Sequence, residues 1–167
     1  LLLNILIYLM IIVFFINILG RIKMDAKEFS ELLTRSIFTL IKEDKFGISI
    51  YHSQNDLTYE KFLESLRTSN DTNDDGVPMS LVESYFLLGK NKITTTDNKI
   101  INLEESIGGG FDDGSYVQRV FSLTNGDTKE YFSCEGYYSS WNGIEWEGSH
   151  FVKVKPREKT IIEYVPE

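Results

Sequence analysis

Residues 116–138, YVQRVFSLTNGDTKEYFSCEGYY, decide the fold expected for this chain. Tyr116 to Leu123 is rich in aromatic and β-branched residues, which favour strands. The dipeptide Asn125-Gly126 follows, and Asn-Gly is a preferred sequence for a two-residue type I′ turn, because both central positions require positive φ. Lys129 to Tyr138 is therefore expected to pair with Tyr116 to Leu123 as an antiparallel hairpin.

The hairpin is expected to extend into a longer meander. A second Asn-Gly stands at Asn142-Gly143, and two further strand-like segments follow, Phe151 to Lys155 and Thr160 to Val165. Pro156 has no backbone N–H to donate to a sheet, so it should end one of these strands. Residues 107–167 are therefore predicted to form an antiparallel meander of about four strands.

The segment before the meander, residues 24–106, has the spacing of helices. Asp25 and Glu28 form a capping box, in which each carboxylate accepts an otherwise unpaired amide hydrogen of the first turn. Apolar residues then recur every three or four positions up to Gly47, which predicts an amphipathic helix with its apolar stripe in the core. The stripe consists of Phe29, Leu32, Leu33, Ile37, Leu40 and Ile41.

Two shorter helices are expected between this helix and the meander. Tyr59 to Leu66 carries a second apolar face, and a Ser80-to-Glu83 capping box predicts a third helix. The alternating stretch Ile48 to Tyr51 is expected to add a short strand. The fold class is therefore α+β, with about three N-terminal helices packed on the C-terminal sheet and residues 24–167 forming one domain.

Length and charge narrow the classes of function. A chain of 167 residues is long enough for one domain with a core, which excludes a multi-domain enzyme. It carries 25 acidic against 17 basic side chains, for a net charge of -8, so direct nucleic-acid binding through phosphate contacts is disfavoured. The single cysteine, Cys134, excludes an internal disulfide, and no zinc-ligand spacing is present.

The N-terminal segment, residues 1–20, is set apart by its hydrophobicity. Leu1 to Leu19 is almost entirely apolar and long enough, as a helix, to cross a hydrocarbon core of ~30 Å. Arg21 and Lys23 follow it, which would place the rest of the chain in the cytoplasm. The alternative is a mistranslated leader before a start at Met24, since the segment is built from the residue types of AT-rich codons. The first interpretation gives a membrane-anchored protein, and the second a cytoplasmic one.

One local motif has the spacing of metal ligands. Asp71, Asn73 and Asp75-Gly76 match the first half of an EF-hand loop, in which alternating oxygens surround calcium. The twelfth position, where the loop needs a bidentate glutamate, is Val82. The alternative is an ordinary turn, because Asp, Asn and Gly are also the common residues of loops. No cofactor is predicted, and calcium is the alternative that this loop leaves open.

Residues suited to catalysis are few. Cys134 lies in a predicted strand, where a small buried thiol is the usual interpretation. His52 and His150 are separated by most of the chain, and carboxylate pairs such as Glu145 with Glu147 arise by chance among 25 acids. No catalytic residue is assigned, and a non-enzymatic protein is expected.

Aromatic side chains are concentrated around the second turn of the meander. Seven of them fall between Tyr131 and Phe151, and aromatics on hairpins give a partner a large contact area at low entropic cost. We expect Tyr131 and Phe151 to face the core, and Trp141 and Trp146, which flank Asn142-Gly143, to be exposed. The predicted binding surface consists of Tyr137, Tyr138, Trp141 and Trp146.

The C-terminal part of the sequence resembles a known group of proteins, the small uncharacterised proteins of tailed bacteriophages and prophages. The matching parts are the glycines at 108–110, the strand Tyr116 to Leu123, the segment Gly136 to Glu145, and VKPREKTI at residues 154–161 with Tyr164. The resemblance covers roughly Gly108 to Tyr164. It implies a viral or mobile-element origin and assigns no role to any residue.

These observations predict a small acidic interaction protein without catalytic activity. We expect it to bind a protein partner, with a basic host protein fitting the charge, through an acidic and aromatic surface. One alternative is a membrane-anchored accessory protein held by Leu1 to Leu19. The other is a calcium-binding module that uses the loop from Asp71 to Gly76.

Overall fold

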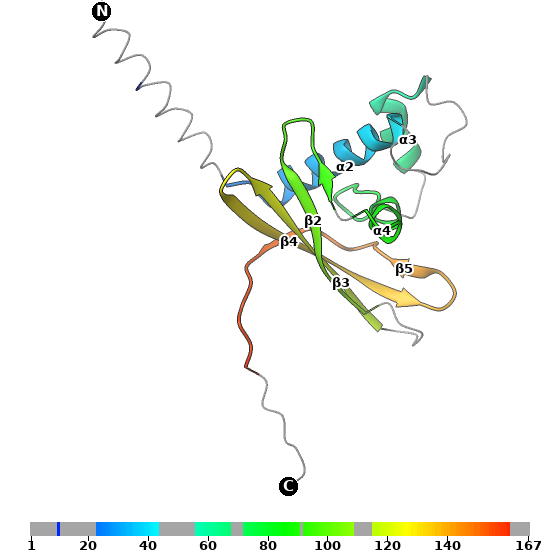
Figure 1. Cartoon of the computed structure of the whole chain (residues 1–167). Coiled ribbons are helices and arrows are strands. Elements are labelled where there is room, and N and C mark those ends of the chain that lie inside the picture. The colour runs from blue at the N-terminus through cyan, green and yellow to red at the C-terminus, as the bar shows by residue number, and fades with distance from the viewer. Residues whose placement is uncertain are drawn as a thin grey trace, which may run out of the picture.

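Helices come first in the chain and strands second (Figure 1). The structure, a computed structural model, describes residues 10, 23–43, 56–67, 72–90, 92–108 and 115–160. Over these residues the helices are α2 (Ala26–Lys42), α3 (Tyr59–Arg67) and α4 (Met79–Leu87). The strands are β1 (Ile93–Thr94), β2 (Ile100–Ile107), β3 (Ser115–Asn125), β4 (Thr128–Ser139), β5 (Gly143–Glu145) and β6 (Val152–Val154). The predicted α+β class is confirmed.

The six described strands form one antiparallel sheet in the order β1-β2-β3-β4-β5, with β6 also paired to β4. β5 pairs with residues 137–139 of β4 and β6 with residues 131–133. Two short strands therefore share one edge of β4. Glu135 and Gly136 lie in the gap between them.

The sheet begins earlier in the chain than the sequence indicates. β1 and all but the last residue of β2 lie within residues 24–106, the part expected to be helical, so the sheet exceeds the four strands predicted. Ile93 and Ile101 are cross-strand partners and both are fully buried. The turn between the two strands uses Asn98 at a φ of 62°, a conformation that asparagine tolerates better than most residues. A two-residue strand is too short to leave a periodic signal.

The central hairpin forms, but its turn lies one residue later than predicted. Asn125 pairs with Thr128, so the turn residues are Gly126 and Asp127. Gly126 has a φ of 56°, and Asn98 is the one described non-glycine residue with positive φ. Glycine at the first central position is the signature of a type II′ turn, which replaces the expected type I′ turn of Asn125-Gly126.

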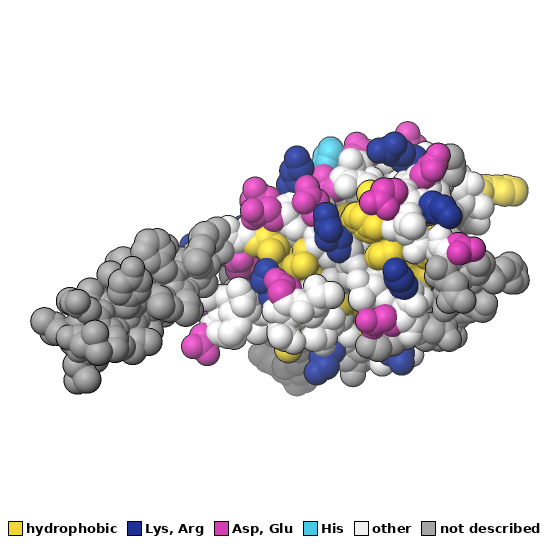
Figure 2. All heavy atoms as spheres, turned by 90° about the horizontal axis from the view of Figure 1, so that it is seen from above, with side chains coloured by type: hydrophobic (Ala, Val, Ile, Leu, Met, Phe, Trp, Pro, Cys, Tyr) yellow, Lys and Arg dark blue, Asp and Glu magenta, His cyan; other side chains and the backbone are white. Residues whose placement is uncertain are grey.

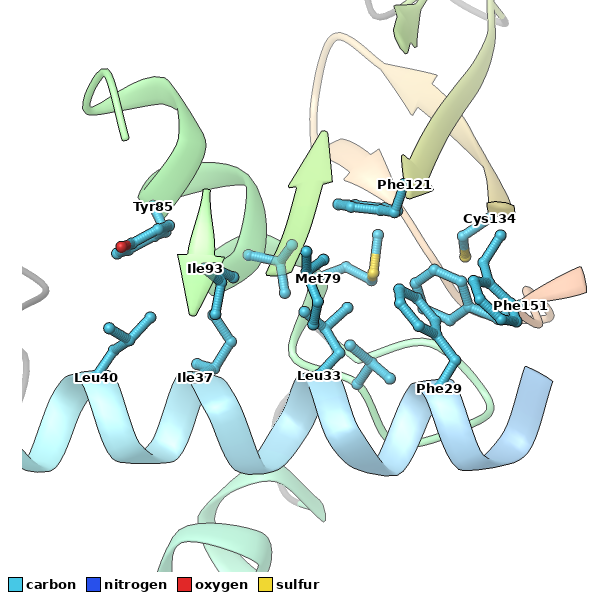
Figure 3. Packing of buried hydrophobic residues seen from close by; sticks show 14 of the residues in the cluster. Phe29, Leu33, Ile37, Leu40, Met79, Tyr85, Ile93, Phe121, Cys134 and Phe151 are labelled. Carbon is cyan, nitrogen blue, oxygen red and sulfur yellow. The ribbon is translucent and has the colours of Figure 1, made fainter. Parts of the chain in front are cut away.

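α2 supplies the centre of the core. Asp25 Oδ1 accepts a hydrogen bond from Glu28 N at 2.8 Å and Glu28 Oε2 accepts one from Asp25 N at 2.9 Å, so the predicted capping box is confirmed. Phe29 stacks on Phe132 of β4 with 4.1 Å between ring centroids. Figure 3 shows the helix pointing one row of side chains at α4 and the strands. That row consists of Phe29, Leu33, Ile37 and Leu40.

α4 is joined to the sheet by an ion pair instead of the predicted capping box. Its N-cap is Pro78, which makes no side-chain hydrogen bond. Arg119 Nε of β3 donates to Glu83 Oε1 at 2.8 Å, and the two side chains are 9% and 16% exposed. Glu83 therefore does not cap its own helix, because a buried guanidinium offers it a stronger, charged hydrogen bond.

Several predictions fall on residues outside the described part of the chain. These are the segment Leu1 to Leu19 except Met10, the strand Ile48 to Tyr51, and the last strand after Thr160. Among the residues that the structure describes, no helix is both long and apolar enough to span a membrane.

Candidate functional site

The helices cover one face of the sheet and leave exposed side chains on the other. Phe121 and Phe132 face the helices and are buried. Successive residues of a strand point to opposite faces, and on the opposite face Tyr116, Glu135 and Tyr137 are exposed. This open face carries the candidate site.

Strand register brings the exposed residues into a row. Tyr116 of β3 is the direct partner of Tyr137 on β4, and Tyr137 is the direct partner of Glu145 on β5. Direct partners lie on the same face with Cβ atoms about 5 Å apart. Glu135 precedes Tyr137 by two residues on that face, and Gln118 opposite it donates to Glu135 Oε1 at 3.4 Å.

A shallow hollow of about 300 Å³ lies along this row, at the gap between β5 and β6. Ser149 Oγ donates a hydrogen bond to the carbonyl oxygen of Glu135, which holds the turn at residues 147–149 beside β4. The hollow is lined by Tyr116, Glu135, Gly136, Tyr137, Glu145, Glu147 and Ser149. We call these residues the aromatic–acidic hollow.

The hollow is electronegative. Within the described residues, no Lys or Arg forms an ion pair with Glu135, Glu145 or Glu147. Partial burial of the hydroxyl and its hydrogen bond to Glu135 raise the pKa of Tyr116 to about 12. The phenol therefore stays neutral near pH 7, and the negative charge comes from the carboxylates.

Other surfaces carry mixed charge. A second hollow of about 440 Å³ on the open face has Glu104 and Glu105 together with Lys155 and Arg157 in its lining, so its charges balance. On the side of the molecule seen in Figure 2, basic side chains likewise lie between acidic ones. The aromatic–acidic hollow differs from both in its uncompensated carboxylates.

The two tryptophans lie in opposite environments. Trp141 is 92% exposed, as predicted, whereas Trp146 is 1% exposed, so the predicted exposure of Trp146 is wrong. Ser139 pairs with Gly143, which leaves Ser140, Trp141 and Asn142 as a three-residue loop with Trp141 at its centre. Trp146 follows β5 and packs against Gly136, whose missing side chain leaves room for the indole.

The remaining aromatic predictions are confirmed in part. Tyr137 is 52% exposed, but Tyr138, on the opposite face, is half-buried against the core. Phe151 is buried against Phe29, with 5.2 Å between ring centroids. Tyr131 is half-buried beside the second hollow, so its expected place in the core is wrong. Tyr131 pairs with Ser122 on the open face of the sheet, so its ring points away from the helices.

The predicted calcium loop is held by hydrogen bonds within the protein. Asn73 Oδ1 accepts from Val77 N at 2.9 Å, and Asp75 Oδ2 accepts from Phe151 N at 2.7 Å. Asp71 lies outside the described residues. No group of three or more His, Cys, Asp or Glu side chains arranged for a metal occurs in the part of the chain described. Asn73 therefore closes the loop on itself, and Asp75 joins the loop to the β5–β6 connection.

His150 also contacts this loop. Its Nδ1 lies 3.2 Å from Asp75 Oδ1 and its Nε2 lies 3.5 Å from Asp74 Oδ2. The contact reinforces two hydrogen bonds of Asp74: its backbone N donates to the carbonyl of Ser149 at 2.9 Å, and its side-chain Oδ1 accepts from Gly148 N at 2.8 Å. These links hold residues 147–150, and with them one wall of the aromatic–acidic hollow.

Cys134 is buried on the face of the sheet that the helices cover, as expected. Burial raises the pKa of its thiol to about 12, so the sulfur stays protonated near pH 7. Its Sγ accepts a hydrogen bond from Asn73 Nδ2 at 3.6 Å. The thiol is therefore part of the core packing beneath the loop.

The binding surface predicted from the sequence does not include Tyr116, Glu135, Glu145 and Glu147. Alternation along β3 and β4 places Tyr116 and Glu135 on the face of Tyr137, but only the register shows that they meet. The site therefore rests on geometry, since no family model, curated protein or solved structure matches the chain.

Proposed function

We propose that this chain is a small acidic interaction protein that binds a protein partner through the open face of its sheet. The binding surface consists of Tyr116, Tyr137 and Trp141 with the carboxylates of Glu135, Glu145 and Glu147. The observation that carries the proposal is Trp141, which is 92% exposed at the centre of the loop that joins β4 to β5, the two strands that carry Tyr137 and Glu145 of the hollow. An indole in water contributes little to its own fold, while tryptophan and tyrosine are the residues in which interface binding energy concentrates.

The charge of the surface supports a basic partner. Three carboxylates without a described cation line one hollow, and the whole chain has a net charge of -8. Complementary charge speeds association and selects among partners, and salt screens it. Binding to a basic protein should therefore weaken as ionic strength rises.

The proposal extends to the origin of the protein and to its mode of action. The resemblance of Gly108 to Tyr164 to small proteins of tailed bacteriophages favours a phage or prophage protein that acts on a host protein in the cytoplasm. The mode of action is occupation of a partner surface without bond-making chemistry. The buried, protonated thiol of Cys134 supports this mode, because it is not placed to act as a nucleophile.

Capture from a bacterial host lysate tests the proposal. The tagged protein is compared with Tyr137→Ala/Trp141→Ala and with Leu87→Ala, a control that removes an 85% exposed apolar side chain from α4. We expect a basic protein to be captured by the wild type and by the control, to be lost with the double variant, and to be released between about 50 and about 500 mM salt. Equal capture by all three proteins, or capture insensitive to salt, would overturn the proposal.

A further inference from the structure

We infer that the aromatic–acidic hollow receives an arginine side chain of the partner. The inference rests on the proposed function and names the chemical group that the surface recognises. It draws on the exposed rings, the carboxylates around them, and the size of the hollow.

The rings provide one half of a guanidinium site. Tyr116 and Tyr137 are 49% and 52% exposed and are direct partners across β3 and β4. The face of an aromatic ring carries partial negative charge and attracts a cation within about 6 Å of its centre. At an exposed site this attraction corresponds to about two- to fivefold in affinity. Because Tyr116 and Tyr137 both line the hollow, a cation bound there is attracted by two rings.

The carboxylates provide the other half. Glu135 comes from β4, Glu145 from β5 and Glu147 from the turn that follows, so the three approach the hollow from different segments. Asn142 Nδ2 donates to Glu145 Oε1 at 2.8 Å, and Gln118 Nε2 donates to Glu135 Oε1 at 3.4 Å. These bonds orient two of the carboxylates. Each can accept further donors, because an ionised carboxylate has about four acceptor positions.

Arginine fits this arrangement better than lysine. A guanidinium is planar, donates in a fork, and can stack on a ring while it hydrogen-bonds to carboxylates at its edge. An ammonium group is compact and strongly hydrated, so it exchanges its water for a shallow site less readily. The volume of about 300 Å³ suits one protruding side chain, since pockets that bury a whole small molecule begin at roughly this size and are deeper.

Two peptides of equal charge test the inference. The probes are acetyl-(Gly-Arg)4-amide and acetyl-(Gly-Lys)4-amide, titrated into the full chain at low salt and followed by NMR shifts of the tyrosine rings and by calorimetry. We expect the arginine peptide to bind about threefold more tightly or better. Its binding should shift the ring signals of Tyr116 and Tyr137.

Matched variants distinguish binding in the hollow from general attraction between opposite charges. Glu145→Gln and Glu64→Gln each remove one negative charge, the first in the hollow and the second on the exposed surface of α3. Glu145→Gln should weaken the arginine peptide by about threefold and abolish the preference over lysine, and Glu64→Gln should leave the preference intact. Tyr137→Ser should act like Glu145→Gln, with circular dichroism confirming that both variants fold.

The outcomes test the arginine inference and the proposed function separately. Binding of neither peptide, equal binding of both, or equal loss in Glu145→Gln and Glu64→Gln would overturn the arginine inference. If capture of the basic partner still depended on Tyr137 and Trp141, the proposed function would stand without it. The proposed function would be overturned instead if the arginine preference depended on the hollow while Tyr137→Ala/Trp141→Ala captured the partner as well as the wild type does.

Discussion

Gly136 and Trp146 pack so closely that no side chain fits between them. A methyl carbon on Gly136 would lie 2.8 Å from Cε3 of the indole and 2.9 Å from the carbonyl oxygen of Glu145. Both distances are shorter than the van der Waals contact of about 3.5 Å. Gly136 therefore allows the chain after β5 to fold its indole beneath β4.

Gly136→Ala is expected to destabilise the fold, because the indole or β5 must move to admit the methyl group. The free energy of unfolding should fall by about 2 kcal/mol, the usual cost of overpacking a core. Urea unfolding followed by circular dichroism measures it. A change of less than about 0.5 kcal/mol would show that the indole has space to shift.

Arg119→Met is expected to cost about 3 kcal/mol of unfolding free energy, since it leaves the largely buried carboxylate of Glu83 without its cation. Arg119 Nη1 also donates to the carbonyl oxygen of Ile107 at 3.1 Å, so the edge of β2 loses a contact as well. The double variant Glu83→Leu/Arg119→Met, which removes both charges, should be more stable than Arg119→Met alone. Equal stability of the two variants in guanidinium unfolding would contradict the coupling.

The same pair predicts a pH dependence. Burial raises the pKa of the Glu83 carboxyl above its ordinary value, against the opposing attraction of Arg119. The folded state thus binds this proton more tightly than the unfolded state, so the contribution of Glu83 to stability grows as the pH falls through its folded pKa. As the pH is lowered from 7 to 4, the melting temperature of the wild type should rise relative to that of Glu83→Gln. A constant or reversed difference would refute the assignment.

Cys134 is expected to resist thiol reagents. With its pKa raised to about 12, the thiolate fraction at pH 8 falls about a thousandfold below that of a free cysteine. Alkylation by iodoacetamide should be slow in buffer and fast in concentrated urea. The raised pKa also implies that the stabilising contribution of the protonated thiol is lost between about pH 9 and 12. Rapid labelling of the folded protein would contradict its burial.

Asp75→Ala is expected to lower the melting temperature with or without calcium. The backbone N–H of Phe151 loses its acceptor at 2.7 Å, and an unsatisfied buried donor costs about 1–3 kcal/mol. Adding calcium or EDTA to the wild type should leave its melting temperature unchanged, since Asn73 and Asp75 already accept bonds from the protein. A calcium-dependent rise would instead support the EF-hand interpretation of the loop.

Local signals in the sequence account for the helices and for the existence of the central hairpin. The capping box of Asp25 and Glu28 and the stripe from Phe29 to Ile41 require only contacts between residues three or four apart, and both are observed. The position of the turn was harder to predict. Gly126 can supply positive φ at the second position of a type I′ turn or at the first position of a type II′ turn, and the observed structure has the second arrangement.

The displacement of the turn by one residue determines which side chains meet at the candidate site. Counting outward from a turn at Asn125-Gly126 pairs Tyr116 with Glu135, whereas the observed turn pairs Tyr116 with Tyr137. Both registers put these side chains on the same face, so the alternation of residues could not distinguish them. Local sequence patterns also do not predict the burial of Trp146, because it depends on Gly136, which lies ten positions earlier on β4.

The opposite environments of Trp141 and Trp146 give the protein two optical reporters that need no label. Fluorescence from Trp141 should be accessible to a dissolved quencher such as iodide, while emission from Trp146 should be shielded until the chain unfolds. A ligand that covers the loop tip would protect the first emitter and leave the second unchanged. One spectrum can therefore follow occupancy of the surface and integrity of the interior at the same time.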